Sequence, residues 1–430
     1  MNIVMMTNTY LPHVGGVARS VDAFTRAYRE RGHRVLVVAP DFRDTPEDEV
    51  DVLRIPAIQN FNGSDFSVML PIPGYLDSAL DRFRPQIIHS HHPFLVGTAA
   101  LRAASLRDCP LVFTHHTMYE QYTHYVPGDS PALRRFVVQI STSYANLCDR
   151  VFAPSESIAE VLKRRGVRIP VEVIPTGVVL DQFSSGDGAF WRRRLGIPQR
   201  AFVIGHVGRL SPEKNLVFLA RAVARAIRGR RDIHFLVVGG GPSASEIRRV
   251  FDAARLADRL HLPGTLIMPE LADAYHAMDV FAFASLSETQ GMVLAEAMAA
   301  GLPVVAVDAP GAREIVMDGY NGYLLPTVDV AAFASALRNV MALNRSQRMA
   351  WTQAVASTAG RYRLERSVDA VLRVYRALET DQPGCGPEAH EPWQANIRRF
   401  KAEWELLKGV AQAASAAASG RRGERRQRAI

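Results

Sequence analysis

The sequence is poor in cysteine and lacks any long hydrophobic run or internal repeat. Its three cysteines, Cys109, Cys148 and Cys385, are too scattered along 430 residues for a disulfide framework or a zinc cluster. No apolar run approaches the roughly 20 residues that a membrane-spanning helix needs. The opening MNIVMMTNTY has neither a basic segment nor a small-residue cleavage site, so we expect no signal peptide. Together these features predict a cytoplasmic protein with reduced thiols.

The charge balance favours anionic partners. The chain has 51 Lys and Arg against 43 Asp and Glu, a formal net charge of +8. Such an excess attracts nucleic acid, phosphorylated ligands or anionic lipid, although a charge excess kept for solubility explains the same number. No zinc finger, recognition helix or basic stripe with interleaved aromatics is present, so we expect no nucleic-acid partner.

Short apolar runs alternate with amphipathic segments along the chain, which predicts an α/β fold with parallel sheets. The expected strands form two series: 2–7, 34–40, 86–91, 111–116, 151–155 and 171–178, then 201–210, 234–241, 260–265, 280–285 and 303–308. We therefore expect two doubly wound domains, residues 1–180 and 181–364, followed by a helix at 365–380 and a basic tail at 381–430. Ligands of such sheets bind beside the carboxyl ends of the strands.

Two loops at expected strand ends suit an anionic ligand. Gly15 and Gly16 precede a helix predicted at 17–31, where helix N–H groups can meet an anion, although a plain tight turn explains them equally. Arg209 and Lys214 follow the first strand of the second half. A guanidinium and an ammonium group together can neutralise a diphosphate without a metal ion. Elsewhere on a protein such a pair would be solvated surface cations, so their position is what favours a ligand.

The segment SETQGMVLAEAMAAG at 287–301 places Glu288 and Glu296 around the start of a helix predicted at 291–300. Eight residues of helix rise about 12 Å, which is comparable with the span from the hexose to the ribose of a nucleotide sugar. Glu288 would then bind sugar hydroxyls, and Glu296 would bind ribose hydroxyls. In isolation, a capping Glu288 and a Glu296 on a solvated helix face explain the same pattern. The backbone N–H groups expected to face the sugar and phosphates belong to Gly291, Met292 and Val293.

The segment THHTMYEQYTHYVP at 114–127 gathers histidines and tyrosines after an expected strand. No cysteine or paired carboxylate completes a metal site there, so we expect no bound metal. A core with hydrogen-bonded imidazoles is a second interpretation.

The motifs together resemble those of the retaining GT-B glycosyltransferases of family 4. The matching strings are VGRLSPEKN, VVGGGP, SETQGMVLAEAMAAGLPVVAV and DGYNGYLL, and the resemblance covers roughly residues 1–380. It implies two Rossmann-like domains that face each other across a cleft, with the helix at 365–380 crossing back to the N-terminal domain. It also implies a nucleotide-sugar donor and no essential metal or other cofactor.

The resemblance implies roles for individual residues. Arg209 and Lys214 would bind the donor diphosphate and stabilise the charge that grows on it, Glu288 would bind the donor sugar, and Glu296 the ribose. His116 matches the histidine that approaches the donor sugar in this family. In the string LPGTLI, the residue placed beside the nucleobase is Leu266.

The string HHTMYE, followed by a tyrosine and by HY, is similar to the bacterial 1,2-diacylglycerol 3-alpha-glucosyltransferases, as is HSHHPFLVG at 89–97. This similarity implies UDP-glucose as donor and a lipid acceptor. Arg134 and Arg135, on a helix predicted at 131–148, would contact anionic headgroups, although a solvated helix face explains them as well. The residues expected on the acceptor side are His115, Tyr119, Glu120, His124 and Tyr125.

The tail suggests peripheral contact with the inner face of the cell membrane. IRRFKAEWELLKG is amphipathic enough to lie on a membrane surface, and a helix packed on the protein body explains the same spacing. GRRGERRQR has the composition of a disordered end.

Other functions fit parts of the pattern. A polysaccharide, glycan or polyol could replace the lipid acceptor. A GT-B sugar-nucleotide epimerase and a non-catalytic nucleotide-sugar binding protein share the fold, but the full donor motif and the acceptor-side histidines disfavour both. An NAD-dependent enzyme is disfavoured because neither half contains G-x-G-x-x-G.

Overall fold

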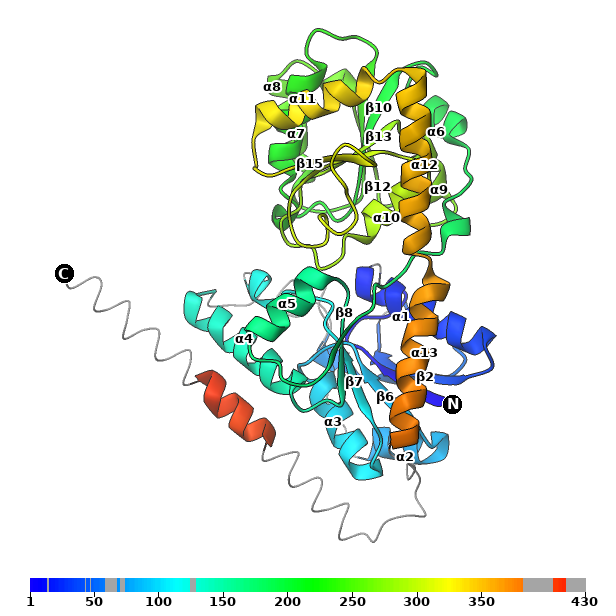
Figure 1. Ribbon diagram of the computed structural model, residues 1–430, viewed down its shortest axis with the longest axis vertical. Coiled ribbons are helices and arrows are strands. Elements are labelled where there is room, and N and C mark those ends of the chain that lie inside the picture. Colours follow the sequence, from blue (N-terminus) through cyan, green and yellow to red (C-terminus); the bar gives the residue numbers. More distant parts are fainter. Residues whose placement is uncertain are drawn as a thin grey trace, which may run out of the picture. The chain divides into compact units, whose positions relative to one another are not determined.

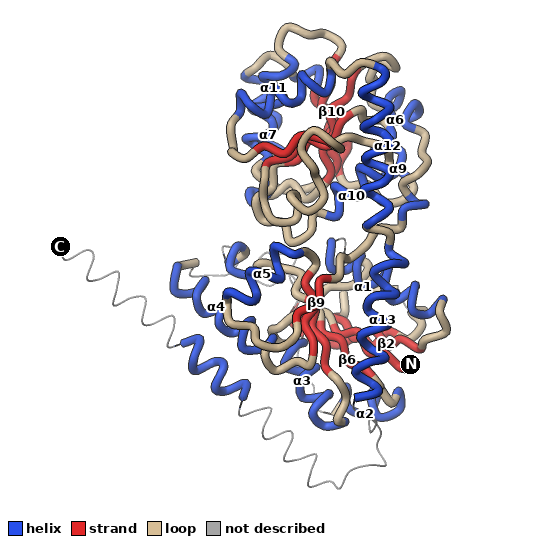
Figure 2. Tube along the Cα trace, in the orientation of Figure 1, coloured by secondary structure: helices blue, strands red, loops and turns tan. Residues whose placement is uncertain are grey.

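The computed structural model describes residues 1–13, 15–42, 44–46, 48–58, 68–69, 74–123, 129–381 and 405–414. The chain divides into two compact units (Figure 1). The first unit comprises Met1–Pro175 and Ser367–Ile430, and the second unit comprises Thr176–Arg366. In each unit the strands form a central layer with helices packed on it (Figure 2).

The first unit has a seven-stranded parallel sheet in the order β3-β2-β1-β6-β7-β8-β9. Its strands are nearly continuous apolar runs because a parallel sheet is covered by helices on both faces. The strands are β1 (Asn2–Met6), β2 (Arg34–Pro40), β3 (Val52–Ile55), β6 (Ile87–Ser90), β7 (Leu111–Thr114), β8 (Arg150–Ala153) and β9 (Val171–Val173). A short antiparallel pair, β4 (Ala57–Ile58) and β5 (Val68–Met69), was not expected from the sequence.

The helices of the first unit follow its strands along the chain. They are α1 (Gly16–Glu30), α2 (Tyr75–Phe83), α3 (Val96–Arg107), α4 (Pro131–Ala145) and α5 (Glu156–Arg164). Ser130 caps α4 by accepting a hydrogen bond from the Leu133 amide at 3.2 Å, and Pro131 occupies the first helical position, where a missing N–H costs nothing. Local sequence signals thus fix where this helix begins.

The second unit has a six-stranded parallel sheet in the order β12-β11-β10-β13-β14-β15. Alternate residues of β10 enter separate cores, with Val203 in one and Ile204 in the other. The strands are β10 (Phe202–Val207), β11 (Ile233–Val238), β12 (Leu260–Gly264), β13 (Val280–Phe283), β14 (Val304–Val307) and β15 (Gly322–Leu325). The helices are α6 (Gly188–Arg194), α7 (Leu216–Ile227), α8 (Ala244–Ala253), α9 (Glu270–His276), α10 (Met292–Ala299), α11 (Val330–Met341) and α12 (Arg345–Arg361).

Both sheets are doubly wound, which confirms the predicted fold class. The strand order reverses between β1 and β6 in the first unit and between β10 and β13 in the second. Crevices at such reversals, outside the carboxyl ends of the strands, are where doubly wound sheets bind ligands. The loops after these strands contain Gly15 and His91 in the first unit, and Arg209 and Glu288 in the second.

The boundaries of the units differ slightly from the expected domains. Residues 176–180 belong to the second unit because the Thr176 amide donates to Gln290 Oε1 at 2.7 Å and the Val178 amide donates to the Tyr362 carbonyl at 2.7 Å. The expected helix at 365–380 is α13 (Leu364–Asp381), and it is continuous through the second boundary into the first unit.

Within the expected tail, residues 405–414 form a helix that packs on the first unit. Leu406 packs against the core of that unit, Ala413 is fully buried, and a Cβ atom on Gly409 would lie 3.0 Å from the Ser143 side chain of α4. This part of the amphipathic segment therefore contacts the protein body, and its remainder lies outside the described residues. Among the helices of the described ranges, none is long and apolar enough to cross a membrane.

Candidate functional site

The strand-end loops of the second unit are tied together by backbone hydrogen bonds. The Gly239 amide donates to the Gly264 carbonyl at 2.8 Å, and the Leu210 amide donates to the Gly240 carbonyl at 2.8 Å. A Cβ atom on Gly239, whose φ is +139°, would lie 1.9 Å from the Gly208 carbonyl oxygen. Only a residue without a side chain permits this approach. The glycines of VGRL and VVGGG therefore fix the loop that follows β10.

Lys214 and Glu288 form an ion pair in the second unit. Lys214 ends the 3₁₀ helix η5 (Pro212–Lys214), and Glu288 lies in the loop between β13 and α10. Their side chains are 16% and 19% exposed. Burial by itself raises the pKa of Glu288, but the charge of Lys214 and the hydrogen bond from its ammonium group lower it, and the pKa lies below its ordinary value. Glu288 is therefore ionised at neutral pH and can accept hydrogen bonds from ligand hydroxyls.

The helix predicted at 291–300 is α10, and Glu296 faces the core. Gly291 precedes the helix with a φ of +70°. Glu296 is only 1% exposed, and the Tyr275 hydroxyl of α9 donates to its Oε2 at 2.8 Å. This burial excludes the alternative in which Glu296 decorates a solvated helix face. Met292 and Val293 are partly exposed, so the positive end of the helix is open to an anion.

The other predicted donor residues lie at the rims of the same loops. Arg209 is exposed, and within the described part of the chain no acidic side chain pairs with it. Leu266 is half-buried against the core of the second unit in the loop after β12. An exposed guanidinium at this position is ready to bind a phosphate bidentately.

In the first unit, the predicted glycines form the start of α1. Gly15 is the N-cap in extended conformation and has no side chain to satisfy the first amides of the helix. A Cβ atom on Gly16 would meet nothing within 4 Å. The space beside Gly16 leaves room for a ligand at the start of α1.

Histidines from two neighbouring strand ends meet in the first unit. His91 follows β6 and His116 follows β7, and His91 Nδ1 lies 2.9 Å from His116 Nε2. Burial lowers the pKa of His116 to about 4 and that of His91 well below its ordinary value. Both imidazoles are therefore neutral at physiological pH. No three His, Cys, Asp or Glu side chains of the described ranges are placed to hold a metal ion.

The remaining residues expected on the acceptor side are held mainly by protein contacts. His115 is 1% exposed, with its ring edge-on to Phe113 at 5.8 Å and Tyr119 at 5.6 Å between centroids. Arg165 Nη2 donates to Glu120 Oε1 at 2.6 Å. These contacts hold His115, Tyr119 and Glu120 against other residues of the first unit. His124 and Tyr125 lie outside the described residues.

Two family models match the chain in succession. Residues 14–182 match Glycosyltransferase Family 4, and residues 201–342 match Glycosyl transferases group 1. A GDP-mannose-dependent alpha-mannosyltransferase of Mycolicibacterium smegmatis is 32% identical over 345 residues, which cover 78% of this chain and 87% of that protein. The chain belongs to glycosyltransferase family 4.

Other relatives of this glycosyltransferase carry different names. An alpha-monoglucosyldiacylglycerol synthase of Streptococcus pneumoniae is 28% identical over 337 residues, covering 75% of each chain. A D-inositol 3-phosphate glycosyltransferase of Kribbella flavida is 33% identical over 320 residues, covering 72% of this chain and 73% of that one. The crystal structure of Anabaena HepE in complex with UDP-glucose superposes with a TM-score of 0.70 at 20% identity, covering 87% of this chain and 99% of that one. This structural likeness confirms the predicted GT-B architecture.

Two residues that fix the loop between β13 and α10 were missed from the sequence. Gln290 is 5% exposed and bonds the Thr176 amide, which anchors the loop between β13 and α10. Gly311, with a φ of +82°, packs against this loop, and a Cβ atom there would lie 2.9 Å from the Gln290 backbone and 3.0 Å from Glu288 Cβ. The signal available in the sequence was the Pro-Gly pair of DAPGAREI directly after an expected strand.

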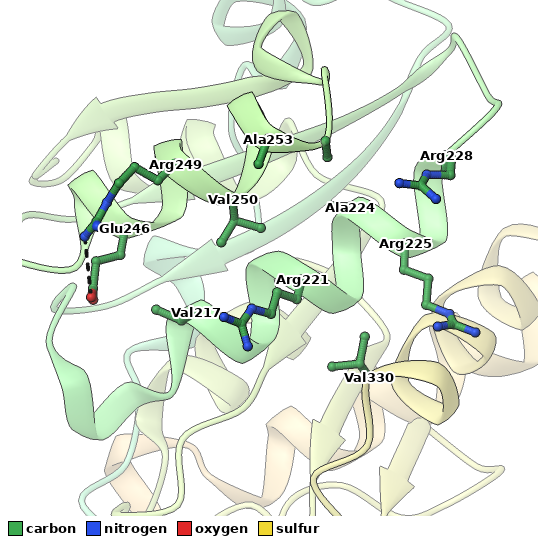
Figure 3. Close-up of a pocket in the computed structure, with 11 residues that line it drawn as sticks. Val217, Arg221, Ala224, Arg225, Arg228, Glu246, Arg249, Val250, Ala253 and Val330 are labelled. Atoms are coloured by element: carbon green, nitrogen blue, oxygen red, sulfur yellow. Dashed lines mark ion pairs between the residues drawn. The ribbon is translucent and has the colours of Figure 1, made fainter.

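The second unit also has a separate pocket between α7 and α8, with a volume of about 620 Å³. Figure 3 shows arginines from both helices around a floor of alanine and valine side chains. Arg249 pairs with Glu246 at 3.7 Å (Figure 3). The residues expected to bind the donor do not line this pocket, whose other arginines are Arg221, Arg225 and Arg228.

Proposed function

We propose that this glycosyltransferase transfers glucose from UDP-glucose, with retention of anomeric configuration, to a lipid such as diacylglycerol. The observation that carries the donor part is the Lys214–Glu288 ion pair beside the start of α10. A cation for the diphosphate, a carboxylate for sugar hydroxyls and a helix N-terminus for phosphate suit the parts of a nucleotide sugar. The UDP-glucose in the HepE complex supports the choice of nucleotide.

The proposed reaction uses protein charges and no metal ion. The bond between the sugar C1 and the diphosphate oxygen breaks, the acceptor hydroxyl oxygen bonds to C1 on the same face, and its proton passes to the departing diphosphate. Arg209 and Lys214 stabilise the negative charge that grows on the leaving group, where preorganised electrostatics act most strongly. Glu288 holds the sugar hydroxyls, Glu296 binds the ribose and His116 positions the hexose.

Two observations bear on the acceptor. The histidine-rich strand ends and the name of the Streptococcus pneumoniae relative favour a diacylglycerol. The higher identity to the inositol-phosphate glycosyltransferase favours a soluble polyol phosphate as the second candidate acceptor. The higher identity to the mannosyltransferase favours GDP-mannose as the second candidate donor. The donor loops are common to both proposals.

The test is transfer by the purified protein, with products resolved by mass. UDP-glucose, UDP-galactose and GDP-mannose are each offered with diacylglycerol in phosphatidylglycerol vesicles or with inositol phosphate. We expect a monoglucosyl lipid that forms only from UDP-glucose and only with the diacylglycerol vesicles. Transfer to inositol phosphate alone would discard the lipid acceptor and keep the donor site, and no turnover of any donor would overturn both.

We also propose that α4 meets the anionic inner face of the cell membrane. Arg134 is exposed and pairs with Asp129 at 2.9 Å, whereas the Nε and Nη2 atoms of Arg135 are buried, so only Arg134 is placed to contact headgroups. An arginine near an anionic surface contributes about 1 kcal/mol, so the R134Q variant is expected to bind phosphatidylglycerol vesicles roughly 5-fold more weakly. The measurement is vesicle co-sedimentation at low salt.

The arginine pocket of the second unit offers a matched control for this membrane experiment. The R221Q variant removes the same charge from an exposed position on α7. It is expected to bind vesicles like the parent protein. Equal losses in R134Q and R221Q would contradict contact through α4, provided that circular dichroism shows both variants folded.

A further inference from the structure

The His91–His116 pair continues into a buried network that reaches α13. The rings of His89 and His91 lie 4.2 Å apart between centroids, and those of His91 and His116 lie 5.1 Å apart at an angle of 26°. His89 Nδ1 lies 2.5 Å from the Tyr375 hydroxyl of α13, and His89 Nε2 lies 2.6 Å from Thr114 Oγ1. With both ring nitrogens hydrogen-bonded, His89 is held in place, and the His91 ring packs against it at a tilt of 31°.

One proton lies between His91 Nδ1 and His116 Nε2. Burial lowers the pKa of His89 to about 3 and that of His116 to about 4, and it lowers the pKa of His91 well below its ordinary value. Each imidazole is therefore neutral and carries a single N–H. The 2.9 Å separation fits one N–H···N hydrogen bond, whose donor is either His91 or His116.

The other nitrogen of His91 decides which ring donates. His91 is 2% exposed, and among the described residues its Nε2 has no hydrogen-bond partner. A proton on Nε2 would be a buried donor without an acceptor, which is rarer in proteins than an unfilled lone pair. The proton of His91 therefore belongs on Nδ1, from which it donates to His116 Nε2. His116, being neutral, carries its own proton on Nδ1.

We infer that His91 is a positioning residue that holds His116 in the Nδ1–H tautomer. His116 then offers a hydrogen-bond donor, and in the proposed reaction this donor meets a hydroxyl oxygen of the transferred hexose. His89, Thr114 and Tyr375 keep the His91 ring in place. The inference about substrate rests on the proposed function, whereas the tautomer assignment stands on the contacts of the first unit.

The test compares replacements of His91 that keep different parts of its side chain. His91→Phe keeps a ring to stack on His89 and removes the donor, whereas His91→Asn keeps an N–H near the position of Nδ1. A second histidine pair provides the matched control, because His234 Nδ1 lies 2.9 Å from His261 Nε2 in the second unit. His234→Phe removes an equivalent contact from β11, far along that strand from its carboxyl end.

The first readout is long-range ¹H–¹⁵N NMR of protein labelled at its 13 histidines, with the His116 signals identified by their loss in His116→Gln. We expect His116 protonated on Nδ1 in the parent protein and in His91→Asn, and a population protonated on Nε2 in His91→Phe. Nε2 protonation of His116 in the parent protein would overturn the inference. This readout needs no turnover, so it remains decisive even if the proposed function fails.

The second readout is kcat and KM for UDP-glucose. Misplacing a group that touches substrate costs roughly 10- to 100-fold in rate, so kcat should fall by that factor in His91→Phe while KM changes little. His91→Asn should restore most of kcat, and His234→Phe should match the parent protein. Parent-like kcat in His91→Phe, or an equal loss in His234→Phe, would contradict the positioning role.

Discussion

Replacing Lys214 by methionine is expected to lower turnover of the donor by roughly 100- to 1000-fold, because it removes a cation that faces the leaving diphosphate. The affinity for UDP should weaken less, since Arg209 and the start of α10 still bind phosphate. Steady-state kinetics and UDP titration of the Lys214→Met variant measure the two effects. Parent-like turnover would discard the proposed role of Lys214.

The same substitution is also expected to destabilise the second unit. Glu288 is 19% exposed and loses the cation that offsets its burial. Breaking one side of a mostly buried pair costs about 1–3 kcal/mol here, below the range for fully buried pairs. The K214M/E288Q variant removes both charges, so urea denaturation should show recovered stability while turnover stays low. Failure of the double variant to recover would contradict this origin of the loss.

The stability lost in Lys214→Met is expected to depend on pH and to become smaller as the pH falls. The folded-state pKa of Glu288 is lowered from 4.5, so its contribution to stability is present above pH 4.5 and is lost as the pH falls through the folded value. Without Lys214, burial raises this pKa, and the ionised carboxylate destabilises the fold above pH 4.5. The gap in unfolding free energy between the parent protein and Lys214→Met should therefore narrow between pH 7 and pH 4. A constant gap would exclude Glu288 as its cause.

The Gly239→Ala variant is expected to lose about 2–6 kcal/mol of unfolding free energy together with UDP binding. The new Cβ atom would lie 1.9 Å from the Gly208 carbonyl oxygen, and a φ of +139° strains any residue with a side chain. Overpacking costs typically 1–3 kcal/mol, and backbone strain of this kind adds about 1–3 kcal/mol. The loop after β10 must move, which displaces Arg209.

Gly229→Ala is the matched control, because it introduces backbone strain without a steric contact. The Gly229 φ of +80° is also positive, but a Cβ atom there would meet nothing within 4 Å. Gly229→Ala should cost about 1–2 kcal/mol from the left-handed backbone alone and leave UDP affinity unchanged. Urea denaturation and UDP titration of both variants make the comparison. Equal costs at the two positions would show that contact with Gly208 contributes nothing.

The local sequence pattern predicted much of the fold and the residues that meet in the candidate site. The alternation of apolar runs with amphipathic segments predicted both parallel sheets, and the spacing of Glu288, Gly291 and Glu296 predicted α10 and the residues at its start. These properties depend on neighbours within one element. Burial on two faces makes a strand continuously apolar, and a helix start needs only a few consecutive residues.

What only the tertiary structure decided is which distant groups meet. Strand order brings β10 beside β13, and this adjacency pairs Lys214 with Glu288. The residue proposed to act in turnover is therefore also expected to contribute to stability. The packing of α9 on α10 buries Glu296 against Tyr275, and the contact of α13 with β6 joins Tyr375 to His89. Ion pairs and hydrogen bonds act over a few ångströms. Separation along the chain says nothing about such distances until the order of the strands is known.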